Sequence, residues 1–242
     1  MKNPLPAQPI QGLTDGIAVL TRLAVSRAPA AVTSLARELG FELTRTNRIL
    51  RTLAHLGMAY RTKSRKYIAG AGMYVLAAQS MFGSGLIERT KPVFERIIKH
   101  GYTTAFGVLW GDIVSYLYHG GPGMPVAQGF GHLGMYPSVR SSLGIVLLAA
   151  REDDEIRDII AGAYRQHARI SDVVRYIAFA REHGYSSVPS QRRTRSIAVI
   201  AGDPPYGALA CSSVPHSDVK RMVPILKDAG DTLARLLTAE EV

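Results

Sequence analysis

Apolar residues recur at helical spacing in the segment LTRTNRILRTLAHLG, residues 43–57. Wound at about 100° per residue, a helix places four aliphatic side chains on one face, those of Ile49, Leu50, Leu53 and Leu56. The opposite face is polar and basic and consists of Thr44, Arg45, Asn47, Arg48, Arg51, Thr52 and His55. The pattern predicts a helix whose back packs on a core and whose front offers hydrogen-bond donors and positive charge.

The segments around this helix predict a small helical unit with a hairpin. Residues 11–26 carry an aliphatic stripe, and VTSLARELGF predicts a short second helix that Thr33 or Ser34 can cap and Gly40 can close. After the helix, MAYRTKSRKYIAG has two short β-prone runs around a basic tip. A short helix, a turn containing glycine and a polar-faced helix make a helix-turn-helix, with the hairpin as its wing.

The rest of the chain mixes helices and strands. GMYVLAAQSMFG is apolar on most of its surface and predicts a linker helix, for which a dimer contact and ordinary burial stay equally open. Two hairpins are predicted, turning at residues 110–112 and 202–205, between amphipathic helices. Strands paired by hairpins with helices elsewhere predict an α+β fold with an antiparallel sheet.

Charge is distributed unevenly along the chain. The net charge is +10, and residues 1–75 hold eleven Lys and Arg against three acids, or +8. The remaining residues hold eighteen Lys and Arg and sixteen acids. Because the positive charge is concentrated in the first third of the chain, we expect that part to bind a polyanion.

Several classes are excluded by composition. Cys211 is the only cysteine, which rules out an intramolecular disulfide and a cysteine-cluster metal site, and the histidines are scattered singly. No metal and no cofactor is therefore expected. No apolar run approaches the roughly 18 residues of a membrane span. The N-terminus lacks the apolar core of a signal peptide, so we expect a cytoplasmic protein without membrane contact.

The front of the predicted recognition helix suits DNA. Arginine can bond guanine, and asparagine adenine, through two hydrogen bonds in the major groove, while wing cations hold phosphates. A solvated basic helix is the alternative, but a preceding helix, a wing and a local charge excess coincide here. The candidate DNA-binding residues are Thr33, Thr44, Arg45, Thr46, Asn47, Arg48, Arg51, Lys63, Arg65 and Lys66.

An enzyme is the rival class. The chain contains no HExxH, GxSxG or P-loop motif. GGPG at residues 120–123 is only a turn signal, and the acids at residues 153–155 suit the start of a helix without catalysis. We therefore predict no enzymatic activity.

The segment LARELGFELTRTNRILRTLAHLGMAYR, followed by RKYIAG, resembles the winged helix-turn-helix of IclR-type bacterial transcription regulators. Arg48, Thr52, Leu53 and Gly57 fall on matching positions of that family's pattern LA..LGL..ST..R.L.TL...G. The organisation then reads as a flexible N-terminus (1–10), a winged helix-turn-helix (11–70), a linker helix (71–84) and a GAF-like effector-binding and oligomerisation domain (85–242). The resemblance implies a dimer or dimer of dimers that binds a palindromic operator under the control of a small organic effector.

The resemblance also implies where the effector binds. YPSVRSSLGIVLLA stands where the family has P.H.TA.GKA.LA; Gly144 persists, whereas the usual His, Ala and Lys are replaced. The helix start would favour a carboxylate, with Arg140 as an added donor or, equally, as a solvent-exposed residue. The implied effector residues are Arg140, Ser141, Ser142, Leu143, Ser196, Cys211 and Ser213.

The next pocket segment departs from the family. Its usual acids are missing from YSSVPSQRRTRSIAVI, and arginines stand there instead. This exchange predicts an anionic effector such as an aromatic acid, while an exposed arginine loop or a second phosphate contact stays open. A ligand-independent DNA-binding regulator, its pocket filled by side chains, is the alternative function.

Overall fold

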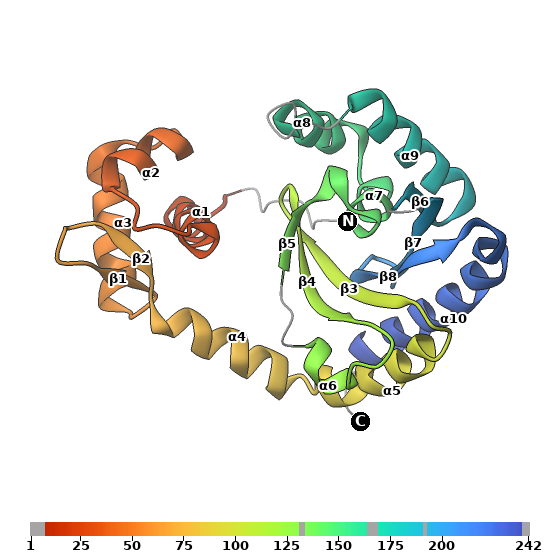
Figure 1. The fold of residues 1–242 in the computed structure, drawn as a ribbon. Helices are drawn as coiled ribbons and strands as arrows, with labels where there is room; N and C mark the ends of the chain where they lie inside the picture. Colours follow the sequence, from red (N-terminus) through yellow and green to blue (C-terminus); the bar gives the residue numbers. More distant parts are fainter. Residues whose placement is uncertain (1–7, 131–133, 164–168, 191–192, 239–242) are drawn as a thin grey trace. The chain divides into compact units, whose positions relative to one another are not determined.

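The computed structural model describes residues 8–130, 134–163, 169–190 and 193–238 (Figure 1). The chain divides into two compact units, one that ends at Ser84 and one that begins at Gly85.

The first unit holds four helices and a two-stranded sheet among its described residues. In chain order they are α1 (Gln11–Val25), α2 (Val32–Leu39), α3 (Leu43–His55), β1 (Ala59–Arg61), β2 (Tyr67–Ala69) and α4 (Ala71–Gly83). Gly40 ends α2 in the left-handed conformation, with φ of 68°, which turns the chain toward α3. The cap predicted at Thr33 or Ser34 is wrong: Ala31 is the N-cap, and no side chain caps the helix.

The predicted helix-turn-helix and wing are confirmed as structural elements. Their core joins residues from α1, α2, α3 and the wing, namely Val19, Leu23, Leu35, Leu50, Leu53, Ala59 and Tyr67. β1 and β2 pair antiparallel, and Ala30 exchanges two 2.8 Å backbone hydrogen bonds with Tyr67. This bridge ties the wing to the segment before α2.

The linker helix α4 is formed as predicted. It buries none of its residues within the chain, although Tyr74, Val75, Leu76 and Phe82 are large and apolar. Ordinary burial, one of the two alternatives for this helix, is therefore not observed within its own unit.

The second unit carries the main sheet. Its helices are α5 (Leu86–Ile98), α6 (Val126–Gly129), α7 (Ser142–Ala149), α8 (Asp153–Ala163), α9 (Ile170–His183) and α10 (Val219–Thr238), with short 3-10 turns η1 (Ser138–Arg140) and η4 (His216–Asp218). Its strands are β3 (Thr103–Trp110), β4 (Ile113–Gly120), β5 (Gly134–Pro137), β6 (Ser186–Pro189), β7 (Thr194–Ala201) and β8 (Gly207–Pro215).

These strands form one antiparallel sheet in the order β5-β4-β3-β8-β7-β6. Both predicted hairpins, β3–β4 and β7–β8, are confirmed, and so is the α+β class. Helices α5 and α10 pack on one face of the sheet, and α7 with α9 packs on the other (Figure 1).

Each face of the sheet has its own core. On the α7 side, Leu143 and Leu148 pack on small strand residues such as Ala198 and Ala210. On the α5 side, the Phe94 and Tyr118 rings stack with centroids 3.9 Å apart. Burial raises the pKa of the Tyr118 hydroxyl to about 12. The small residues on the α7 side let that helix lie close to the sheet.

Candidate nucleic-acid interface and effector site

The exposed front of α3 presents the predicted DNA-reading side chains. Thr44, Asn47, Arg48 and Arg51 are exposed and share one face because they are spaced three or four residues apart. The back of the helix buries Leu50 and Leu53. No ion pair neutralises Arg48 or Arg51 within the described residues, so both guanidinium groups can meet an anion.

Thr46 does not belong to this surface. Its side chain is fully buried, and its hydroxyl donates to the Glu42 carbonyl at 2.9 Å. Thr46 lies four and seven residues before Leu50 and Leu53, and therefore faces the core with them. The expectation that Thr46 contacts DNA is wrong.

Arg45 is engaged inside the unit. Its guanidinium forms an ion pair with Asp15 of α1, whose carboxylate is 2% exposed and also accepts from Gln11 at 2.8 Å. It further lies 6.0 Å from the centre of the Phe41 ring. Within the unit, Arg45 joins α1 to the start of α3, and its contact with DNA stays a prediction.

The wing presents three exposed cations, those of Lys63, Arg65 and Lys66. The turn between the strands is closed by Thr62, whose backbone N–H and hydroxyl both reach the Lys66 carbonyl, at 2.8 and 3.1 Å. Arg65 adopts the left-handed conformation, with φ of 61°. Thr33 is exposed on α2. These positions suit contacts to phosphates more than to base edges.

A chain of hydroxyl groups crosses the α7 side of the sheet in the second unit. The Ser142 and Ser196 hydroxyls lie 2.7 Å apart, and those of Ser196 and Ser212 lie 2.9 Å apart. Ser186 donates to the Ser142 carbonyl at 2.7 Å. Three strands and the start of α7 thus converge on one polar strip, which we call the serine chain (Ser142, Ser196, Ser212).

The start of α7 is held by short contacts. Ser141 caps the helix by accepting from the Gly144 N–H at 3.4 Å, and its hydroxyl lies 3.0 Å from the Tyr116 hydroxyl. A Cβ on Gly144 would sit 2.0 Å from the Ser138 carbonyl oxygen, so only glycine fits there. Burial raises the pKa of the Tyr116 hydroxyl. Leu143, predicted to contact effector, is fully buried in the hydrophobic core.

Two predicted pocket residues on β8 lie elsewhere. Cys211 is buried on the opposite face of the sheet, 3.8 Å from the Thr104 hydroxyl, and burial raises the pKa of its thiol to about 12. Ser213 is exposed and has φ of 63°. The register shifts between Arg195 and Ile197, which breaks simple alternation. The shared wall predicted for Cys211 and Ser213 is therefore wrong.

Sequence reasoning missed Ser212, which takes the place expected for Ser213. It also missed Tyr116 and Ser186. A signal was available for Ser212, because it lies two residues after Ala210, which faces α7. Tyr116 and Ser186 come from distant strands, and no local pattern connects them with α7.

Arg140 does not join the serine chain. It is exposed and lines a separate cleft of about 210 Å³ together with Arg169 and Asp172. Its side chain is open to solvent in this cleft, and its contact with an effector stays a prediction.

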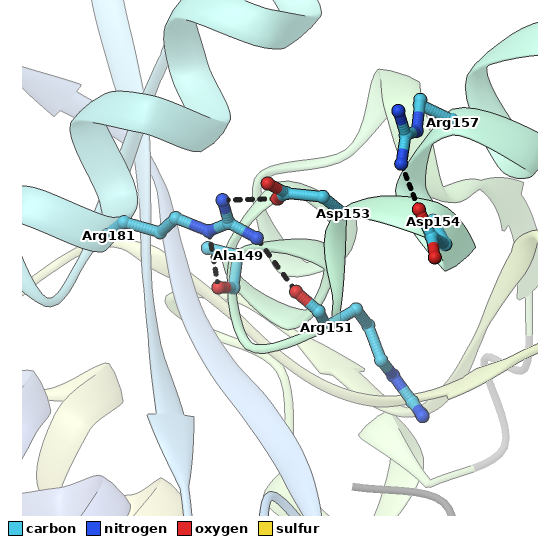
Figure 2. A network of polar contacts seen from close by, with 6 residues as sticks. All are labelled: Ala149, Arg151, Asp153, Asp154, Arg157 and Arg181. Atoms are coloured by element: carbon cyan, nitrogen blue, oxygen red, sulfur yellow. Dashed lines mark hydrogen bonds and ion pairs between the residues drawn. The ribbon is translucent and has the colours of Figure 1, made fainter.

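A second polar network steadies the far end of α7. The Arg181 guanidinium donates to the carbonyls of Ala149 at 3.0 Å and Arg151 at 2.7 Å, and pairs with Asp153 at 2.7 Å (Figure 2). Carbonyls at the end of a helix lack partners within it, and a cation there also suits the helix dipole. One side chain of α9 therefore links the end of α7 to the start of α8.

Within the described ranges, no group of three or more His, Cys, Asp and Glu side chains is arranged to hold a metal ion. Over the same ranges, none of the helices combines the length and the apolar character required to cross a membrane.

Solved structures of similar fold are transcription regulators. An IclR family regulator from Brucella abortus matches with a TM-score of 0.73 and 19% identity, over 97% of this chain and 95% of that one. An IclR-type regulator from a Silicibacter species matches with a TM-score of 0.70 and 21% identity, over 95% and 97%.

A third similar structure carries a ligand. It is an IclR homologue from Microbacterium hydrocarbonoxydans in complex with 4-hydroxybenzoate, with a TM-score of 0.57 and 21% identity, over 95% of this chain and 100% of that one. No protein-family model and no curated protein matches the sequence. The likeness over both units establishes the fold, and the chain has the fold of the IclR family transcriptional regulators that its motifs resemble.

Proposed function

We propose that this protein is a DNA-binding transcriptional regulator. The observation that carries the proposal is the exposed front of α3, where Asn47, Arg48 and Arg51 stand beside a basic wing. A helix with this front and a packed back matches the docking geometry of a major-groove reader. The regulators of the same fold support this function over an enzymatic one.

The test is DNA binding by the full chain, measured by fluorescence anisotropy. Arg48→Ala is expected to weaken binding to a selected operator by about 1–3 kcal/mol and to reduce discrimination against changed bases. Arg65→Gly is expected to weaken binding to all DNA sequences alike, because it removes a phosphate contact. The slope of log affinity against log salt concentration should fall by about one for the same reason.

The matched control is Arg235→Ala, which removes one positive charge from α10 in the other unit. It should leave operator binding unchanged. Equal affinity and equal specificity of Arg48→Ala and wild type would remove α3 from the interface.

We further propose that the second unit binds a small organic acid as effector. The serine chain supports this, because it supplies several hydroxyl donors beside the start of α7. The 4-hydroxybenzoate in a structural relative makes aromatic acids the first compounds to test. Binding raises the melting temperature by mass action, so a thermal-shift screen of carboxylates and their amides is suitable. No shift with any compound would favour the ligand-independent alternative.

The proposal includes a homodimer, or a dimer of dimers, on a palindromic operator. Its support is α4, where Tyr74 and Phe82 are 70% and 65% exposed and no residue is buried. A large exposed apolar surface on a soluble protein commonly marks an interface. Leu76→Glu is expected to shift the mass measured by light scattering toward the monomer, whereas Gln79→Glu on the same helix should not. An unchanged mass for Leu76→Glu would exclude α4 from the interface.

A further inference from the structure

A cleft of about 670 Å³ opens at the β6 edge of the sheet. Its walls come from α9, β6, β7 and the start of α10, which meet at this edge (Figure 1). The volume lies within the range of pockets for small organic molecules. None of the residues of the serine chain lines it.

The cleft lies at the β6 edge, whereas the serine chain lies on the α7 face of the sheet. Ser186 and Ser187 are neighbours on β6 and therefore point in opposite directions. Ser186 donates to Ser142, which starts the serine chain. Ser187 instead accepts from Arg195, and both line the cleft. The β6 edge thus offers a second place for a ligand.

The lining of the cleft is positively charged. It contains the cations of Arg175, Arg195 and Lys220 and no acidic residue. Arg175 is paired with Asp172 at 2.7 Å, whereas neither Arg195 nor Lys220 forms an ion pair within the described residues. Two cations therefore remain without a countercharge at this edge.

Arg195 is positioned in advance. Its Nε donates to the Ser187 hydroxyl at 3.0 Å, and one terminal nitrogen donates to the Ser187 carbonyl at 2.6 Å. Both acceptors are neutral, so they orient the guanidinium without cancelling its charge. A half-buried, oriented guanidinium favours a carboxylate or phosphate, because charge-assisted hydrogen bonds are the stronger kind.

The remaining walls are aromatic. Tyr176, Phe179 and Tyr185 are partly buried and line the cleft. The rings of Phe179 and Tyr185 meet edge to face, with centroids 5.3 Å apart. Such rings offer a flat apolar body a packing surface, which an inorganic anion cannot use.

We infer that this cleft binds a small aromatic carboxylate, with its carboxylate on Arg195 and Lys220 and its ring against Phe179 and Tyr185. The site goes beyond the effector site of the proposed function, since it shares no residue with the serine chain. It holds whether or not the serine chain takes a ligand of its own.

The test is isothermal titration calorimetry on the full chain, with benzoate, benzamide and inorganic phosphate as probes. Benzoate should bind at least about tenfold more tightly than either of the others, because benzamide lacks the charge and phosphate lacks the ring. Phosphate binding as tightly as benzoate, or benzamide as tightly as benzoate, overturns the inference.

Variants locate the site. Arg195→Gln should weaken benzoate binding by at least about tenfold. Lys220→Gln should weaken it by about threefold or more, a smaller effect because the Lys220 side chain makes no hydrogen bond within the described residues that would orient it. The control Arg235→Gln lies fifteen residues further along α10 than Lys220, about 22 Å away, and should have no effect.

The Ser212→Ala variant separates the two sites. Benzoate binding that is lost in Ser212→Ala but kept in Arg195→Gln and Lys220→Gln assigns the ligand to the serine chain and overturns the inference. The proposed function would survive that result. Absence of any benzoate binding also overturns the inference. Operator binding by the same sample tests the proposed DNA-binding function separately.

Discussion

Replacing Arg45 by alanine is expected to destabilise the first unit rather than to impair base recognition directly. The substitution leaves the Asp15 carboxylate, 2% exposed, with Gln11 as its remaining side-chain partner. Breaking a fully buried ion pair costs about 3–5 kcal/mol, and an exposed pair contributes about 0–1 kcal/mol. Because Arg45 is 43% exposed, we expect an intermediate loss of about 2 kcal/mol.

Two signals of urea unfolding can separate the units. Trp110 is the only tryptophan and lies in the second unit, so its fluorescence follows that unit. Circular dichroism at 222 nm follows helices of both. The first unit should unfold at a lower urea concentration in Arg45→Ala, which is seen in the part of the dichroism transition that Trp110 fluorescence does not follow. In a thermal melt, the same loss of stability should lower the midpoint of that part by about 10 °C.

A double-mutant cycle supplies the control. Asp15→Ala together with Arg45→Ala should be more stable than the sum of the single changes predicts, by about 1 kcal/mol or more, because no unpaired charge remains. The reasoning is refuted if Arg45→Ala unfolds like wild type yet loses operator specificity as Arg48→Ala does. Arg45 would then read bases, and its pairing with Asp15 would be incidental.

Three further predictions concern the second unit. Gly144→Ala should destabilise by about 3 kcal/mol or more in urea unfolding, since its Cβ would overlap the Ser138 backbone, whereas Gly12→Ala, with open space around it, should not destabilise. Arg181→Ala should lower the free energy of unfolding by about 1 kcal/mol and speed up hydrogen exchange at the end of α7. Unchanged exchange there would contradict the stabilising role of the Arg181 network in Figure 2. Hydrogen bonds from Tyr102, Arg221 and Ser217 lower the pKa of Asp218 to about 2, so its stabilisation is present above about pH 4 and is lost as the pH falls toward 2. Asp218→Asn should flatten this part of a stability-against-pH curve, and an unchanged curve would exclude the carboxylate as its cause.

Periodicity predicted the elements of this fold because their signals are local. The recurrence of aliphatic residues every three or four positions placed α3, and turn residues between β-prone runs placed both hairpins. The ends of elements were less predictable. Leu56 follows the last residue of α3 and is 64% exposed, although the helical periodicity predicted it on the core face. The burial of such a residue depends on the turn at which the helix ends.

Individual site residues were harder to predict because they depend on distant partners. Arg45 looks like its neighbour Arg48 until Asp15, thirty residues earlier, is brought beside it by the packing of α1. A register shift opposite β8 exchanges the roles of Ser212 and Ser213. The pairing of Ser187 with Arg195 depends on strand register, which no local pattern reveals.

Selection of DNA from a random pool by the full chain tests the central proposal most directly. The account predicts enrichment of one palindromic sequence by the wild type, and loss of that enrichment in Arg48→Ala but not in Arg235→Ala. Retention of DNA without enrichment of any sequence would contradict it, and the basic front of α3 would then be a nonspecific surface.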